Sequence, residues 1–235
     1  MFDRWLQSPV FYSFTRSRLA QFAALIALLM IGGALFAPLL APLNPFDLAS
    51  LDLNDSLLPP SWMEQGQGKY LLGTDDQGRD VLSTILYGSR ISLLVGFSSV
   101  ILAMFLGVGL GLVSGFVGGR LDAVIMRIAD VQLSFPAILI ALLIDGVARV
   151  IFADQGHGEQ MAILVLIGSI SLANWVSYAR TVRGSTLVEK NKEYVQAARV
   201  IGVPSIAIML KHVLPNVTGP VLVIATINIA TAIIT

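Results

Sequence analysis

The sequence predicts an all-α membrane protein, a polytopic helical bundle, from three observations. Of the 235 residues, 55% are hydrophobic and only 13% are charged, whereas soluble domains usually carry about a quarter charged residues. The mean hydropathy is +0.79. Five apolar segments, each close to the roughly 20 residues that a spanning helix needs, alternate with polar stretches. We therefore expect five spans in this chain.

The composition argues against several classes of function. The net charge is zero, which makes nucleic acid an unsuitable partner. The chain has no cysteine, which excludes disulfides, thiol catalysis and cysteine metal sites. Its two histidines, His157 and His212, lie far apart in the sequence, and no cluster of His, Asp, Glu or Ser indicates a catalytic centre. We expect no enzymatic activity, no metal site and no cofactor in this chain.

The N-terminal part of the chain predicts one span followed by an irregular segment. Residues 1–18 are short and mildly basic, and residues 19–43 form the first span. This apolar run is too long for the h-region of a typical cleaved signal peptide. Residues 44–90 are rich in prolines and acids and include an amphipathic helix. We expect Asp80 to cap a helix that begins at Val81.

The remainder of the chain, residues 91–235, predicts a core of four spans. Their bounds are 91–113, 133–152, 161–178 and 217–235. Residues 118–130 are expected to be a short charged connector. Gly107, Gly111 and Gly115 recur every four residues on one face of their helix, a spacing that lets a neighbouring helix approach closely. We expect these glycines to serve helix packing.

Asp145 and Arg149 stand four residues apart near the far end of the 133–152 span. An ionisable residue inside a membrane indicates a functional site by default, here a substrate path. A salt-bridged pair at the membrane interface, with the arginine reaching water, suits their place near the span end better. Both interpretations, path and interface pair, stay open.

Residues 179–216 form the longest basic and polar interval between two apolar segments. Within them, residues 193–216 predict two short helices with a corner between them. The first helix has two faces, an apolar one with Tyr194, Ala197, Ala198 and Ile201 and a polar one with Lys192, Gln196 and Arg199.

The corner and the end of this hairpin follow from glycine and proline. Gly202 suits a helix end that needs positive φ. Pro204 suits the first turn of a second helix, which we expect to stop at Leu214 and Pro215. Such a hairpin between spans has the form of a docking element, and the alternative is an amphipathic connector lying on the lipid surface.

The orientation follows from the distribution of lysine and arginine. One side of the predicted topology, made of residues 1–18, 114–130 and 179–216, carries eleven of these residues, and the other side carries four. We therefore expect a cytoplasmic N-terminus and a cytoplasmic 179–216 stretch. Residues 44–90 are then extracytoplasmic.

Three separate segments resemble the permease subunits of ABC importers. Gln196-Ala197-Ala198, followed by Gly202 and by Leu214-Pro215, is similar to the family's EAA-type motif, with Gln196 where the motif has Glu. Residues 71–96 and 126–142 resemble the C-type subunits of dipeptide, oligopeptide and nickel importers. The resemblance extends from about residue 15 to the end of the chain.

The resemblance implies a non-catalytic permease in a bacterial inner membrane, forming half of a translocation path. It implies a homologous B-type permease, two cytoplasmic ATPase subunits that bind ATP and Mg, and an extracytoplasmic substrate-binding protein as partners. In keeping with this, the chain has no Gly-x-x-x-x-Gly-Lys-Ser/Thr phosphate loop. From this motif together with the apolar face of the first helix, the residues that we expect to couple to an ATPase are Glu193, Tyr194, Gln196, Ala197, Ala198, Ile201, Gly202, Leu214 and Pro215.

The substrate and the extent of the protein are open at this point. Di- or oligopeptides are the leading expectation, and nickel chelates or glutathione are the alternatives. An ion-coupled secondary transporter is disfavoured, because such proteins typically place charges or broken helices at mid-membrane. Family members have a sixth span, so we expect that this sequence is a part of a longer chain.

Overall fold

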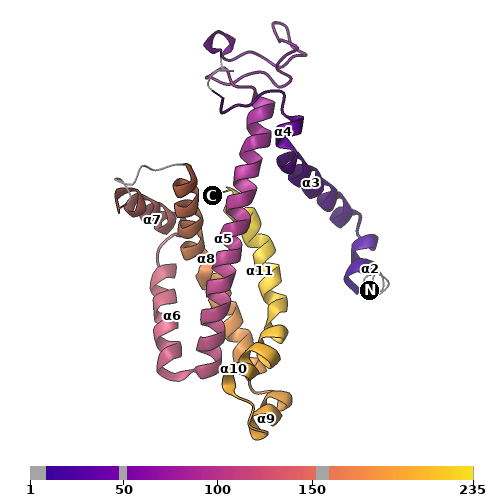
Figure 1. The fold of residues 1–235 in the computed structure, drawn as a ribbon. Coiled ribbons are helices and arrows are strands. Elements are labelled where there is room, and N and C mark those ends of the chain that lie inside the picture. Colours follow the sequence, from indigo (N-terminus) through magenta and orange to yellow (C-terminus); the bar gives the residue numbers. More distant parts are fainter. Residues whose placement is uncertain (1–8, 48–51, 152–158, 235) are drawn as a thin grey trace. The chain divides into compact units, whose positions relative to one another are not determined.

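The protein is all-α in the part that the structure describes. The described residues of this computed structural model are 9–47, 52–151 and 159–234. Among them, β pairing is limited to one isolated bridge between Thr74 and Asp80. The predicted fold class is therefore confirmed. The chain forms two compact units, residues 1–93 and 94–235, whose helices are labelled in Figure 1.

The first unit begins with three helices, α2 (Pro9–Arg16), α3 (Arg18–Leu35) and α4 (Ala37–Leu40). The Ser17 hydroxyl caps α3 by accepting a hydrogen bond of 3.2 Å from the Ala20 amide. Phe36 leaves helical geometry and separates α3 from α4. The predicted 19–43 span thus corresponds to two consecutive helices that end at Leu40.

Residues 52–80 fold into an irregular segment with one short 3-10 helix, η2 (Leu53–Asp55). Tyr70 is fully buried there, and its hydroxyl donates to Asp55 over 2.8 Å. Asp80 accepts a hydrogen bond of 2.8 Å from the Ser83 amide at the start of α5 (Val81–Val117). This contact confirms Asp80 as the helix cap.

Three long helices extend beyond the spans that the hydropathy predicts. They are α5, with 37 residues, α8 (Glu159–Glu189), with 31, and α11 (Leu214–Ile234), with 21. At 1.5 Å per residue α5 is about 55 Å long, more than the roughly 30 Å of a hydrocarbon core. Among the described residues, four helices are long and apolar enough to cross a membrane, or five if one bent pair counts as a span.

That bent pair, α6 (Gly119–Leu133) and α7 (Ala137–Ile151), corrects the predicted connector over 118–130. Most of those residues are helical, and the helix continues into the predicted 133–152 span. It breaks before Pro136, where the pyrrolidine ring removes an amide donor and disfavours helical geometry at the preceding residue. The axes of α6 and α7 differ by 94°. The sequence pattern does not predict this helix, because the charged residues within 118–130 lower its hydropathy. Hydropathy detects long apolar segments and does not detect helices that carry charges.

The second unit is built around the part of α5 after residue 93, with α8 and α11. Figure 1 shows these helices side by side, with α6 running back along α8 and α7 turning away from α6. One buried cluster joins α6 to α8, and its members are Ile125, Ala129, Trp175, Val176 and Ala179. Because α8 contacts α6, α7 and α11, it is the central helix of this unit.

Candidate functional site

The predicted hairpin is present, and its first helix is α9 (Glu193–Val200). The acid at its first position, Glu193, suits the positive end of the helix dipole. At the other end, Gly202 has φ +82°. The Gly202 amide donates to Arg199 over 3.0 Å, and the Val203 amide donates to Ala198 over 3.0 Å. These two bonds form a Schellman cap, which accounts for glycine at this corner.

The burial of α9 changes the interpretation of its faces. Val195 is completely buried and Ala198 is 5% exposed, so this pair packs against the protein itself. Ala197 is exposed, and Ile201 is 78% exposed. The expectation that Ala197 and Ala198 share one docking face is therefore wrong. The outward apolar surface of α9 and its C-cap residue consists of Ala197, Val200 and Ile201.

The second helix of the hairpin does not stop at Leu214 and Pro215, as the sequence predicts. The short helix α10 (Ser205–Ile208) leads through one π-helical segment, η4 (Met209–Val213), directly into α11. The Leu214 amide donates to Met209, five residues earlier. Widening the helix at this point accommodates Pro215, which has no amide to donate. Leu214 and Pro215 thus lie inside a continuous helical path.

The Tyr194 hydroxyl joins four elements of the second unit. It donates to the Glu189 carboxylate at the end of α8, and it lies 3.2 Å from the His212 carbonyl in η4. It accepts a hydrogen bond of 3.0 Å from the Asn216 side chain in α11. Burial raises the pKa of Tyr194, as does its hydrogen bond to Glu189, so the hydroxyl keeps its proton at neutral pH. α9 is therefore fastened to both adjoining long helices.

Two further contacts hold the hairpin and the residues just before it against the end of α5. The Lys190 ammonium donates to the Gly115 carbonyl over 2.7 Å. The Arg199 guanidinium lies 5.2 Å from the centre of the Phe116 ring, within the range of a cation–π contact. The Gln196 amide reaches back to the Lys190 carbonyl at 3.4 Å. The hairpin is thus positioned by α5 as well as by α8 and α11.

The three spaced glycines of α5 lie against α8 of the same chain. A Cβ atom at Gly107 would stand 2.4 Å from the Trp175 carbonyl oxygen, and one at Gly111 would stand 2.4 Å from the Ala179 carbonyl oxygen. At Gly115 the nearest atom would be Cβ of Thr186, 2.8 Å away. The backbone of α8 thus occupies the volume that a side chain would need at these positions.

Polar contacts fasten α6 to α8 along its inner side. The Arg183 guanidinium binds Asp122 with two bonds of 2.5 and 2.7 Å, and Arg180 pairs with Asp130. Further along α6, the Gln132 side chain accepts a hydrogen bond of 2.8 Å from the Trp175 indole. The Gln132 amide also donates to two carbonyls of α8. Both acids of α6 are thereby engaged by arginines of α8.

Comparison with known proteins assigns the chain to a family. Residues 107–235, which include the glycines and the hairpin, match the model of the binding-protein-dependent transport system inner membrane component. Residues 8–60 match the N-terminal transmembrane domain of oligopeptide transport permease C. The chain belongs to the ABC importer permeases. It is a C-type subunit, as the resemblance implies.

Relatives of this permease carry names from peptide transport. The chain is 38% identical over 223 residues to the di/tripeptide transport system permease protein of Pseudomonas aeruginosa, covering 94% of this chain and 69% of the relative. It is 38% identical over 212 residues to the dipeptide permease of Haemophilus influenzae, covering 90% and 68%. It is 33% identical over 222 residues to the oligopeptide permease of Bacillus subtilis, covering 94% and 66%. The chain thus spans about two thirds of the length of these relatives.

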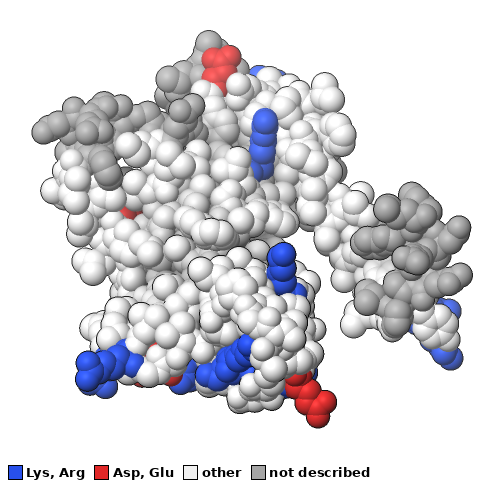
Figure 2. Space-filling model, turned by 60° about the horizontal axis from the view of Figure 1, so that its bottom comes forward, with Lys and Arg blue, Asp and Glu red and all other residues white. Residues whose placement is uncertain are grey.

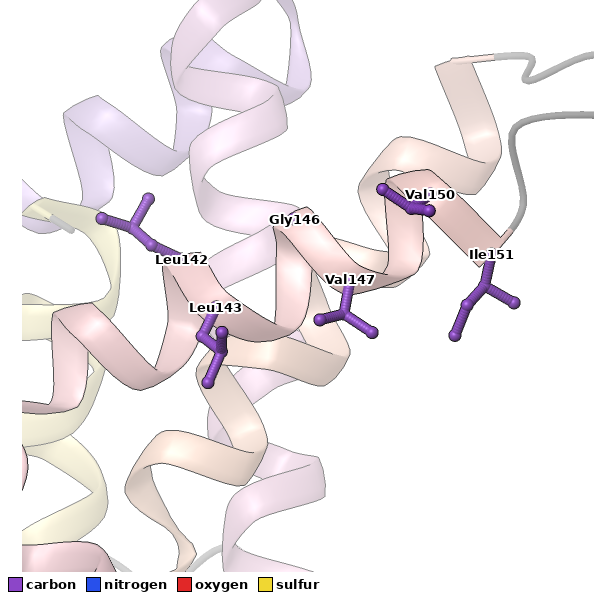
Figure 3. A pocket seen from close by; sticks show the side chains of 6 residues that line it. All are labelled: Leu142, Leu143, Gly146, Val147, Val150 and Ile151. Carbon is purple, nitrogen blue, oxygen red and sulfur yellow. The ribbon is translucent and has the colours of Figure 1, made fainter.

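The predicted pair of Asp145 and Arg149 lies on α7 of the permease. Asp145 is half-buried, and the Arg149 side chain lies outside the described residues. Figure 3 shows a shallow groove on α7 that is lined by apolar residues alone. The lining residues are Leu142, Leu143, Gly146, Val147, Val150 and Ile151. This groove has no polar side chain to orient a substrate. The other histidine considered, His157, lies outside the described residues.

Sequence reasoning missed three residues that position α9. Val195 is the buried anchor of the helix, and its spacing of three from Ala198 was the available signal. Glu189 precedes the hairpin, Asn216 is its last residue, and both contact the Tyr194 hydroxyl. They are far apart in the sequence, and no local pattern connects them. The fold of the hairpin alone brings them together.

Proposed function

We propose that this permease carries di- or oligopeptides across the bacterial inner membrane. The observation that supports this substrate is the group of relatives named for di-, tri- and oligopeptide transport, at 33–38% identity over most of the chain. A glutathione permease of Pectobacterium atrosepticum, 36% identical over 223 residues, supports glutathione as the second candidate. Peptides are favoured because most of the relatives carry peptide names.

The proposed assembly contains four further subunits. A homologous B-type permease would supply the other half of the translocation path, and a binding protein would deliver the substrate, in keeping with the binding-protein-dependent family. Two cytoplasmic ATPases would bind ATP and Mg and carry out hydrolysis. This chain would bind no cofactor of its own.

The hairpin 193–216 is the proposed coupling element to an ATPase subunit. Its outward surface of Ala197, Val200 and Ile201 is apolar, and Val200 is 86% exposed. The contacts of Tyr194 and Arg199 connect this surface to three long helices. A force on α9 would therefore reach α8 and α11 through the hydrogen bonds of Tyr194, and α5 through the cation–π contact of Arg199 with Phe116. This arrangement suits the transfer of motion better than a connector lying on lipid.

The proposed orientation places the hairpin and the N-terminus in the cytoplasm. Figure 2 shows lysine and arginine side chains gathered on the face of the second unit where α6 and α9 lie. The exposed basic residues of α6 are Arg120 and Arg127, and those in or beside the hairpin include Lys192, Arg199 and Lys211. Such an excess of basic residues beside the spans is typical of the cytoplasmic side.

Uptake by the reconstituted transporter tests this function. The permease would be co-expressed with its companion permease, ATPases and binding protein, and the complex placed in proteoliposomes. We expect ATP-dependent accumulation of a radiolabelled dipeptide, inhibited by excess unlabelled tripeptide and unaffected by nickel chelates. Accumulation of labelled glutathione without any dipeptide uptake would overturn the peptide assignment. Dipeptide uptake that follows an ion gradient and needs no ATP would overturn the importer assignment.

A further inference from the structure

The outer face of α6 combines two unpaired arginines with an apolar stripe. Arg120 and Arg127 are both exposed, and within the described residues neither has a hydrogen bond or an ion pair. They stand seven residues apart, so they lie on the same side of the helix, separated by about 10 Å along its axis. The neighbouring outward residues are Leu121, Val124, Ile128 and Val131, which are 44–57% exposed.

The acids of α6 cannot neutralise these arginines. Asp122 is held by two hydrogen bonds from Arg183, and it also accepts one from Ser114. Asp130 is paired with Arg180 of α8. The inner side of α6 is therefore electrically balanced, whereas its outer side carries two positive charges. Within the described structure, no carboxylate pairs with Arg120 or Arg127, so both charges are available to an anionic ligand.

We propose that this face, defined by Arg120, Arg127 and the apolar stripe, binds an anionic phospholipid. The two guanidinium groups bind the phosphate of the headgroup, for which arginine has a suitable fork of donors. The acyl chains lie along Val124, Ile128 and Val131. One helix face thus matches both parts of the ligand. The arginines suit the charged headgroup, and the apolar stripe suits the acyl chains.

A lipid fits this face better than an acidic protein surface. A protein partner would have to remove two guanidinium groups from water, and the desolvation of buried ion pairs offsets much of their attraction. A headgroup leaves the arginines at the hydrated membrane interface, where basic residues attract anionic lipids. The position of Arg127, two turns along α6 from Arg120, agrees with an arginine whose aliphatic stem lies in the apolar layer and whose head reaches the phosphates.

Lipid binding to the purified permease complex tests the proposal. Binding of phosphatidylglycerol is measured by native mass spectrometry and by the shift of the melting temperature on titration, with phosphatidylcholine as the neutral lipid. We expect phosphatidylglycerol, but not phosphatidylcholine, to bind and stabilise. The double variant R120Q/R127Q should lose about thirty-fold in affinity, from roughly 1 kcal/mol for each basic residue near an anionic surface. Its melting temperature without added lipid should match that of the wild type, because the replaced groups make no hydrogen bond or ion pair within the described structure.

The control variant R90Q/K211Q removes the same amount of charge from two other exposed positions. Neither Arg90 nor Lys211 has a side-chain hydrogen bond or ion pair within the described structure. It should keep wild-type affinity. Equal loss in both double variants would overturn the site, since the effect would then follow net charge. Stabilisation by inorganic phosphate at the same concentration would show an anion site without lipid specificity and would overturn the lipid assignment. So would unchanged lipid binding by R120Q/R127Q together with loss of a partner subunit, because the face would then be a protein interface.

Discussion

Removal of the Tyr194 hydroxyl should loosen α9 while leaving the membrane helices intact. In Tyr194→Phe, Glu189 loses one donor and keeps its 2.9 Å contact with Lys192. Hydrogen bonds to charged groups contribute about 1.5–3 kcal/mol. Because Glu189 retains Lys192 and the Tyr194 side of the site is 38% exposed, we expect the lower end of this range.

The effect can be measured at backbone amides that report on the end of α9. A loss of about 1.4 kcal/mol corresponds to a tenfold change in an equilibrium constant. The amides of Ile201 and Val203, which bond to Ala197 and Ala198, should therefore exchange with deuterium about ten times faster. In the reconstituted complex, the peptide transported per ATP hydrolysed should fall, because α9 no longer moves with α8 and α11.

The matched control is Tyr87→Phe, which deletes the same hydroxyl from a tyrosine of the first unit. Tyr87 packs edge-on against Phe46, and its hydroxyl has no hydrogen bond within the described structure. We expect no change in amide exchange or in coupling. If Tyr194→Phe also keeps wild-type exchange at Ile201 and wild-type coupling, the hydroxyl does not position α9 and our interpretation of this network is refuted.

Three further predictions concern the outer surface of α9, the glycine face and the topology. Ala197→Glu should keep the subunit folded yet reduce ATPase copurification, whereas Ala198→Glu should lower the yield of folded subunit because it buries a charge. If Ala198→Glu instead reduces copurification and Ala197→Glu reduces folding, then Ala198 faces the partner. Gly111→Leu should lower the free energy of unfolding by at least about 1–3 kcal/mol through overpacking, which would reduce the yield and the melting temperature. Gly109→Leu should be tolerated, because the space around Gly109 is open. Equal losses would contradict the close packing on α8. In this cysteine-free chain, Glu64→Cys should react with an impermeant thiol reagent in intact cells, and reaction only after permeabilisation would reverse the proposed orientation.

The sequence by itself determined the fold class and the family. Apolar length predicts membrane helices because a bilayer of fixed thickness needs a fixed number of apolar residues. The Gly202 corner was predictable too, because a positive φ restricts the choice of residue at that single position. Local motifs such as the Asp80 cap depend on neighbours within one helical turn, and the sequence shows them directly.

The tertiary structure decided which surfaces are available and where the helices end. Spacing alone placed Ala197 and Ala198 on one face, yet only packing against the rest of the chain shows that Ala198 is covered. Pro215 predicts the end of a helix, because proline has no amide to donate. The π-helical segment before it accommodates this missing donor, so the helix continues into α11. The meeting of Glu189 and Asn216 at the Tyr194 hydroxyl depends on the whole hairpin, because a contact between residues far apart in the chain leaves no periodic pattern in the sequence.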